Sequence, residues 1–212
     1  MRTIIVGVIF LYHLYVIRHG ETEWNTEKRL QGRLDSNLTA KGETDAQLLG
    51  ERLKEIDFQR IISSPSNRTI KTARLVRGER KVSIETDERL MEIDLGEWQG
   101  LKEDEIKSRY PEKAEAFWHI PSSYESVDGE SFFDVKKRVA AFLEDLDKTK
   151  PTGNVLVVTH GIVIKALYLL CRNESVENLW KPPFIHGTSL TIIHVENGEL
   201  KLHTEACTAH CS

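Results

Sequence analysis

The pattern of hydrophobic and polar residues along the chain predicts strands that alternate with helices. Aliphatic and aromatic residues fill 11–17 without clean alternation, which is typical of a strand buried on both faces of a parallel sheet. The segment 154–158 is a similar aliphatic run, and 60–63 and 82–84 are shorter ones. Near the end of the chain, apolar residues on both sides of Asn197-Gly198 predict a β-hairpin with a tight turn.

Between these strands, apolar residues recur every three or four positions, as they do on the inner face of a helix. Ala46, Leu49, Leu53 and Ile56 have this spacing and follow Thr39, a residue suited to cap a helix N-terminus. A second helix is expected from Ser64-Pro65 to just before Gly78, and further helices are expected over 103–109, 112–118 and 162–171. A longer one is expected to start near Gly129, with an apolar face formed by Phe132, Val135, Val139, Phe142 and Leu146. This alternation predicts a three-layer α/β/α sandwich around a mostly parallel sheet.

The chain length favours a single domain. It has 212 residues, of which 40% are hydrophobic, enough for one sizeable core, and no repeat or low-complexity linker interrupts it. We therefore expect one domain over 1–212, with a lid-like insertion at about 101–129 and a frayed tail after Glu205.

The net charge and the cysteine content limit the kinds of binding partner and the cellular compartment that we expect. The formal net charge is −4 and the sequence pI is near 6.1, which argues against nucleic acid or an anionic membrane as the main partner. Any anion must then be bound by a local cluster of cations. The three cysteines are too few for a disulfide framework, and their odd number favours a reducing compartment. We expect a cytoplasmic protein that is a monomer or a homodimer.

The N-terminus offers a competing interpretation. Met1-Arg2 and the apolar run that follows resemble the start of a secretory signal, but no small-x-small cleavage site follows them. The run is also shorter than the ~20 residues that a membrane-spanning helix requires. We favour a buried first strand preceded by a short apolar extension over 1–10.

Two of the predicted strands end in the same way, in Arg18-His19-Gly20 and in Thr159-His160-Gly161. The carboxyl ends of parallel strands form the ligand crevice of an open sheet, so both imidazoles can reach one place. A single histidine at a strand end is more often a core residue, but two in matching contexts indicate a site. Arg68 and the carboxylates of 89–100 would each be ordinary surface charge if taken alone.

Taken together, these segments resemble the histidine phosphatase superfamily, whose fold is phosphoglycerate-mutase-like. The resemblance extends in order from about Leu14 to Glu199. It rests on five blocks: Arg18-His19-Gly20-Glu21-Thr22 with Trp24-Asn25, Ser63-Ser64-Pro65 with Arg68-Thr69 and Thr72-Ala73, Glu92, Gly96 with Trp98, and Thr159-His160-Gly161. Within the superfamily the chain is most similar to the broad-specificity (PhoE-type) branch, through Arg29-Leu30-Gln31-Gly32, Asp128-Gly129-Glu130 and Leu179-Trp180-Lys181-Pro182-Pro183.

The resemblance implies a phosphomonoester hydrolase that works through a phosphohistidine on His19, with Glu92 as the general acid. Glu97 and Asp94 are rival acids in the same loop, and Glu92 is preferred because its position after Arg89-Leu90 matches the family. The implied catalytic partners are Arg18, Arg68 and His160, and the implied substrate-binding residues are Thr22, Asn25, Gln31 and Gly161.

The chemistry of these residue types agrees with that assignment. Phosphoryl transfer needs positioning and charge neutralisation, which two guanidiniums, each in bidentate contact, and a cationic His160 would supply. His19 can attack phosphorus through one ring nitrogen if a backbone carbonyl holds the proton on the other.

No metal or cofactor is expected. His203, Cys207, His210 and Cys211 are residue types that bind zinc, but their spacing fits none of the usual patterns.

A mutase reading is disfavoured because a mutase needs extra cations above the site, whereas 101–129 holds four basic and seven acidic residues. Its apolar residues, Phe117, Trp118, Ile120 and Tyr124, favour esters with apolar or aromatic groups, or else simply pack the insertion. The alternatives left open are a cofactor-dependent phosphoglycerate mutase, a dedicated metabolite phosphatase such as α-ribazole phosphatase, and a non-catalytic anion-binding scaffold.

Overall fold

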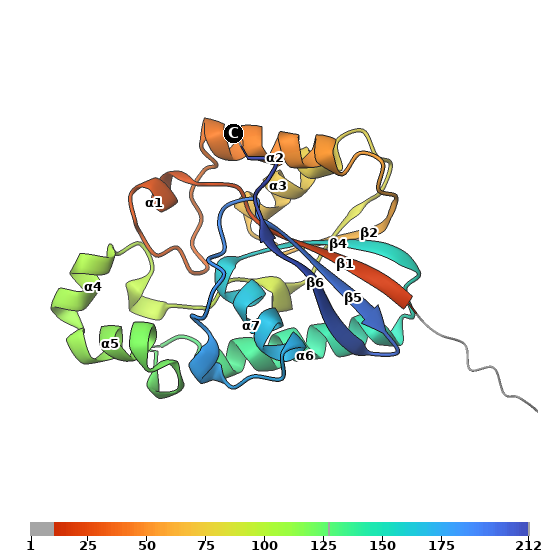
Figure 1. Ribbon diagram of the computed structural model, residues 1–212. Coiled ribbons are helices and arrows are strands. Elements are labelled where there is room, and N and C mark those ends of the chain that lie inside the picture. Colours follow the sequence, from red (N-terminus) through yellow and green to blue (C-terminus); the bar gives the residue numbers. More distant parts are fainter. Residues whose placement is uncertain (1–10, 127, 212) are drawn as a thin grey trace, which may run out of the picture.

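A six-stranded sheet lies between two layers of helices in the computed structural model, which describes residues 11–126 and 128–211 (Figure 1). The strands are β1 (Leu11–Arg18), β2 (Phe58–Ser63), β3 (Ile84–Thr86), β4 (Gly153–Thr159), β5 (Leu190–Glu196) and β6 (Glu199–Cys207). Their order is β3-β2-β4-β1-β5-β6, in which the first four are parallel and β5 and β6 form an antiparallel hairpin. The predicted α/β class with a mostly parallel sheet is confirmed. The N-terminal extension over 1–10 lies outside the described residues.

Two helices cover each face of the sheet (Figure 1). One face is covered by α2 (Ala40–Arg52) and α3 (Asn67–Arg77), and the other by α6 (Phe132–Lys148) and α7 (Gly161–Cys171). The short helices α1 (Glu23–Thr26), α4 (Glu103–Arg109) and α5 (Pro111–His119) lie beyond the carboxyl ends of the parallel strands. Within the described ranges, no helix is long and apolar enough to cross a membrane.

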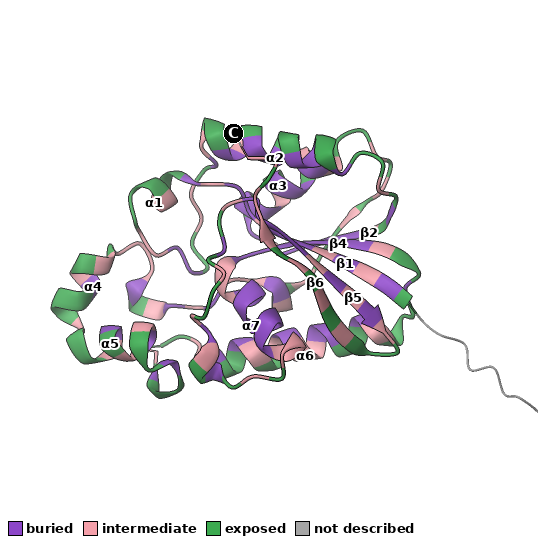
Figure 2. Ribbon diagram, viewed as in Figure 1, coloured by how far each residue is buried: buried purple, intermediate pink, exposed green. Residues whose placement is uncertain are grey.

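The helices turn their apolar stripes toward the sheet, and the strands between them are mostly buried (Figure 2). Helix α2 begins where Thr39 predicts, because the Thr39 hydroxyl accepts a hydrogen bond from Gly42 N at 3.0 Å. Helix α6 starts at Phe132, with Ser131 and Asp134 forming a capping box, slightly later than the expected start near Gly129.

Three elements were predicted with boundaries that are wrong by two residues. Strand β2 begins at Phe58, where the apolar run predicted a start at Arg60. Helix α3 begins at Asn67 instead of at Ser64-Pro65, since its first free amide, Asn67 N, donates to the Asp35 carboxylate at 2.7 Å. A cap supplied by a distant loop has no local sequence signature. The short strand β3 covers 84–86 where the apolar run predicted 82–84, because Ile84, Glu85 and Thr86 are the residues that pair with β2.

The C-terminal tail is not frayed as expected. Strand β6 continues to Cys207, which pairs with Leu190 of β5. Beyond it, His210 Nε2 lies 3.2 Å from Thr188 Oγ1 and the Arg52 guanidinium contacts Cys207 Sγ at 3.2 Å. Pairing with β5 orders the tail. The apolar pattern of the sequence did not indicate this pairing, because the pattern does not report which strand is the neighbour. Within β6, the ring of His203 packs against the ring of His194, with centroids 4.5 Å apart.

Candidate active site

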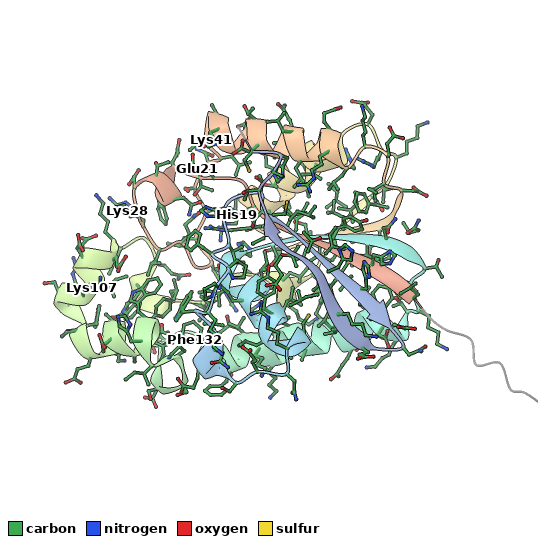
Figure 3. The ribbon with its side chains drawn as sticks, in the orientation of Figure 1. His19, Glu21, Lys28, Lys41, Lys107 and Phe132 are labelled. Carbon is green, nitrogen blue, oxygen red and sulfur yellow. The ribbon has the colours of Figure 1, made fainter. Side chains whose placement is uncertain are left out.

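The two strands that end in histidine are neighbours in the sheet. In the β1–β4 register, Arg18 is opposite Thr159, and His19 N donates to Thr159 O at 2.9 Å. The side chains that follow β1 and β4 therefore meet at the carboxyl edge, where the strand order changes direction. The rings of His19 and His160 lie 5.3 Å apart between centroids, and Figure 3 shows His19 in the interior of the molecule.

His19 is held as a neutral imidazole with one free nitrogen. Its Nδ1 lies 2.8 Å from Gly20 O, and because a carbonyl can only accept, Nδ1 carries the proton and Nε2 keeps its lone pair. Burial, followed by the nearby Arg68 and Arg18 charges, holds the pKa of His19 well below its ordinary value. The tautomer required of a nucleophile is thus the one that the backbone fixes.

The glycine after His19 is required by packing rather than by a ligand. A Cβ on Gly20 would lie 2.6 Å from Gly42 O, at the first turn of α2. The close approach lets Gly20 N donate to Thr72 Oγ1 of α3 at 2.9 Å. The loop after β1 is therefore fixed by two helices.

His160 is also neutral, which corrects the expectation of a third cation. Its Nδ1 is 3.1 Å from Arg68 Nη2, a nitrogen that can only donate, so Nδ1 accepts and Nε2 carries the proton, which it donates to Ser64 Oγ at 2.8 Å. Burial and the Arg68 charge hold the pKa of His160 well below its ordinary value. In the sequence, nothing local indicates that a guanidinium 92 residues away occupies this nitrogen.

Arg68 is almost completely buried in a cage of acceptors. Its Nη1 donates to Asp35 Oδ1 at 2.7 Å and to Leu34 O at 2.6 Å, and its Nη2 donates to Gly32 O at 2.7 Å. The expected bidentate contact of Arg68 with phosphate was wrong, since Nη1 and Nη2 each donate to two acceptors of the protein. Asp35 was missed because its role appears only when the 32–35 loop folds over α3.

Arg18 and Arg68 each retain one buried donor. The Nε of each guanidinium is buried and has no acceptor among the described residues, while Arg18 Nη1 donates to Ile185 O at 2.7 Å. Buried donors are normally satisfied, and the charges of both guanidiniums act on His19, so the two unpaired donors mark a place for an anion. A phosphoryl group suits it, since two positive charges would face two negative ones.

Glu92 flanks this place on the side of Arg18. A Cβ on Gly161 would lie 3.8 Å from Arg18 Nε and 3.9 Å from Glu92 Oε2, so the two groups flank the same residue. Glu92 Oε2 accepts from Ile162 N at 3.3 Å.

The rival acids have other partners. Glu97 accepts from the Tyr110 hydroxyl at 2.8 Å, and Asp94 accepts from Gly96 N at 3.0 Å and lies 3.5 Å from Arg33 Nη1. Geometry therefore favours Glu92.

Thr22, Asn25 and Gln31 bond to one another. The Thr22 hydroxyl accepts a hydrogen bond from Gln31 Nε2 at 2.8 Å, and Asn25 Oδ1 accepts one from Thr22 N at 3.1 Å. Thr22 and Asn25 form the capping box of α1, and Gln31 directly precedes the 32–35 loop that cages Arg68. In this structure they hold that loop together, and their predicted contact with phosphate stays a prediction.

A cavity of about 640 Å³ opens beside Arg18, Glu92 and Gly161. Its walls are mostly apolar and come from 117–119 of α5, the first turn of α7 and the loop 180–185. The aromatic residues of 101–129 divide between two roles: Tyr124 is buried in a cluster with Trp98 and Phe132, whereas Phe117 and Trp118 also line the cavity. Lys107 of α4, labelled in Figure 3, and Lys165 of α7 line it as well, and sequence reasoning missed Lys165.

Comparison with known proteins agrees with this geometry. The family model described as "Histidine phosphatase superfamily (branch 1)" matches residues 14–208. "Phosphoserine phosphatase 1" of Hydrogenobacter thermophilus is 33% identical over 183 residues, covering 86% of each chain, and "Probable phosphoglycerate mutase GpmB" of Enterobacter sp. (strain 638) is 35% identical over 74% of this chain and 73% of its own. The solved structure "Bacillus stearothermophilus YhfR" superposes with a TM-score of 0.92 at 41% identity, covering 95% of this chain and 100% of that one.

Proposed function

The chain belongs to the histidine phosphatase superfamily and is a phosphatase of that family, and on that premise we propose that it hydrolyses phosphate monoesters through a phosphohistidine formed on His19, without a metal. The observation that carries the proposal is the bond from Nδ1 of His19 to Gly20 O, which leaves Nε2 unprotonated beside two orphan guanidinium donors. A nucleophile, an anion site and a carboxyl group next to one cavity are the parts that a two-step phosphoryl transfer requires.

In the first step, Nε2 of His19 forms a bond to phosphorus as the bond from phosphorus to the ester oxygen breaks. The neutral imidazole needs no prior deprotonation. The leaving oxygen takes a proton from the Glu92 carboxyl, so an alcohol departs and Glu92 becomes a carboxylate.

In the second step, water attacks phosphorus and the N–P bond breaks, returning the lone pair to His19 Nε2. Glu92 accepts a proton from the water and is again a carboxylic acid, ready for the next ester. Inorganic phosphate is the second product, and the enzyme is unchanged.

The surrounding groups stabilise charge on the phosphoryl oxygens. We assign the Nε–H groups of Arg18 and Arg68 to these oxygens, together with the Gly161 amide at the N-terminus of α7. His160 accepts from Arg68 and thereby orients it, and its Nε2–H can donate to the phosphoryl group in place of Ser64 Oγ. Thr22, Asn25 and Gln31 are assigned to substrate binding on their match to the family.

The apolar walls of the cavity favour a broad range of esters with apolar or aromatic leaving groups, as in the PhoE-type branch. The rings of Phe117, Trp118 and Trp180 lie 4.7 to 5.4 Å apart and form one wall. An apolar wall discriminates weakly among apolar groups. We also propose that 101–129 acts as an insertion over the cavity within a single domain, and that the protein works in the cytoplasm as a monomer or homodimer on small phosphate esters.

Trp118→Ala tests this wall. The change should lower kcat/KM for phenyl phosphate about tenfold, because losing an aromatic contact costs ~1–1.5 kcal/mol, and it should leave glycerol 2-phosphate almost unaffected. A panel of esters with phosphate release as the readout gives both values, and Trp118→Phe is the matched control that keeps a ring. An equal loss of kcat/KM for both esters would contradict the proposed preference for aromatic leaving groups.

A panel of substrates distinguishes the proposed broad-specificity phosphatase from a mutase and from a phosphatase dedicated to one metabolite. Two relatives named above are described as a phosphoserine phosphatase and a phosphoglycerate mutase, so phosphoserine and 3-phosphoglycerate belong in the panel. Isomerisation of primed 3-phosphoglycerate faster than phosphate release would indicate a mutase, and one ester far ahead of all others would indicate a dedicated enzyme. Release of p-nitrophenol from its phosphate excludes a scaffold without activity.

A further inference from the structure

Lys165 is a buried cation in the cavity wall that the reaction above does not use. It lies on α7 one helical turn after Gly161 and is 6% exposed. Its ammonium donates to Lys181 O at 2.5 Å and to Pro183 O at 2.7 Å. Burial, followed by the charge of Arg172, lowers the pKa of Lys165 to about 8.

The acceptors of Lys165 are backbone carbonyls, and no carboxylate lies within ion-pair distance of it among the residues described. The charge of Glu205 acts on Lys165, but the two groups form no ion pair. Burying an ammonium without such a pair disfavours folding, whereas an apolar side chain of similar length would fill the same space at lower cost. Packing alone therefore does not explain a charged residue at this position. Its two hydrogen bonds indicate the role, because both acceptors belong to the segment 181–185, which the ammonium holds in place.

The 181–185 segment has few other restraints. It has no regular secondary structure, and the side chains of Lys181, Pro182 and Phe184 are exposed, Phe184 by 69%. Pro182 and Pro183 have no N–H to donate. At its start, Lys181 N donates to Asn178 O at 3.1 Å and the Lys181 ammonium lies 3.9 Å from Glu174. Beyond Lys181, packing of the buried Ile185 and hydrogen bonds to the segment's carbonyls fix its path.

The same segment holds Arg18. Ile185, two residues after Pro183, offers its carbonyl to Arg18 Nη1 at 2.7 Å. That bond sets the rotation of the guanidinium and so the direction of its orphan Nε–H. Lys165 fixes the path of the segment, and the segment fixes Arg18.

We propose that Lys165 is a positioning residue for phosphoryl transfer, which acts on Arg18 through the carbonyls of the 181–185 segment. The inference rests on the proposed function, because it assigns Arg18 to the phosphoryl oxygens. Its distinctive consequence is coupling: Lys165 should matter only while Arg18 is present.

A double-mutant cycle tests this coupling. Lys165→Met should lower kcat/KM on p-nitrophenyl phosphate by up to ~100-fold, since a small misplacement of a catalytic group can cost that much. It should also weaken orthovanadate binding. In the Arg18→Ala background, the same change should cost less than about twofold in both measurements, because the group it positions is absent. Lys165→Arg, which can still donate to two carbonyls, should restore most of the activity.

The matched control is Lys136→Met. Lys136 of α6 also donates to a loop carbonyl, Glu174 O, at 2.7 Å, but it is not part of the cavity wall. Its replacement should leave kcat/KM and vanadate binding within about twofold of the parent, and thermal unfolding of all variants checks that each is folded.

Three outcomes overturn the proposal: full activity in Lys165→Met, a loss of the same size with and without Arg18, or an equal loss in Lys136→Met. If Lys165→Met does not fold, Lys165→Gln takes its place in the cycle under the same criteria. An inactive parent protein would instead refute the proposed function itself, and vanadate binding would then decide the coupling alone.

Discussion

His19→Ala should hydrolyse p-nitrophenyl phosphate at least ~10⁴-fold more slowly than the parent protein, as expected when a nucleophile that forms a covalent intermediate is removed. The substitution leaves the anion site intact, so orthovanadate should still bind. Activity is measured as kcat/KM, with thermal unfolding to confirm that the variant is folded.

The control for this experiment is a histidine within β1, the strand that precedes His19. His13 is partly buried in β1 and contacts Asn154 Oδ1 at 3.2 Å, at the opposite end of the strand from the site. His13→Ala should keep nearly full activity. If His19→Ala also kept its activity, the assignment of the nucleophile would be refuted.

Glu92→Gln should slow alkyl phosphates by about 10²–10⁴-fold and p-nitrophenyl phosphate much less, because only a basic leaving oxygen needs a proton from a general acid. The amide has nearly the same shape as the carboxyl but cannot transfer a proton. The measurement is kcat for a series of esters ordered by the acidity of the leaving alcohol.

Glu97→Gln is the comparison for this series. Glu97 belongs to the same loop and bonds to Tyr110, so its change should leave the dependence on leaving group as it is in the parent. Losses of equal size for alkyl and nitrophenyl esters in Glu92→Gln would contradict its role as the acid.

The strand pattern predicted the part of the site that depends on topology. Because the apolar runs before His19 and His160 indicate buried parallel strands, the meeting of the two rings follows from the sequence and occurs at 5.3 Å. The neutral tautomer of His19 was only a condition for attack in the sequence analysis, and the bond from Nδ1 to Gly20 O meets that condition.

What could not be predicted depends on contacts between distant loops. The cage around Arg68 is built from Gly32, Leu34 and Asp35, and it both removes the expected bidentate contact and makes His160 neutral. Likewise, Lys165 reads as an ordinary helix residue until the 181–185 segment folds over it. Periodicity reports which side of an element is buried, but it carries no information on the partner of a buried polar group.

The first step of the reaction can be observed most directly by trapping the phosphorylated protein. The parent enzyme is mixed with a ³²P-labelled ester, quenched in alkali within the first turnover and digested, and the labelled peptide is sequenced by mass spectrometry. The account predicts one phosphoryl group, stable in alkali and lost in acid, on the imidazole of His19, formed at least as fast as steady-state turnover and missing from His19→Ala. A phosphoryl group on another residue, or turnover by the parent with no labelled protein, would contradict it.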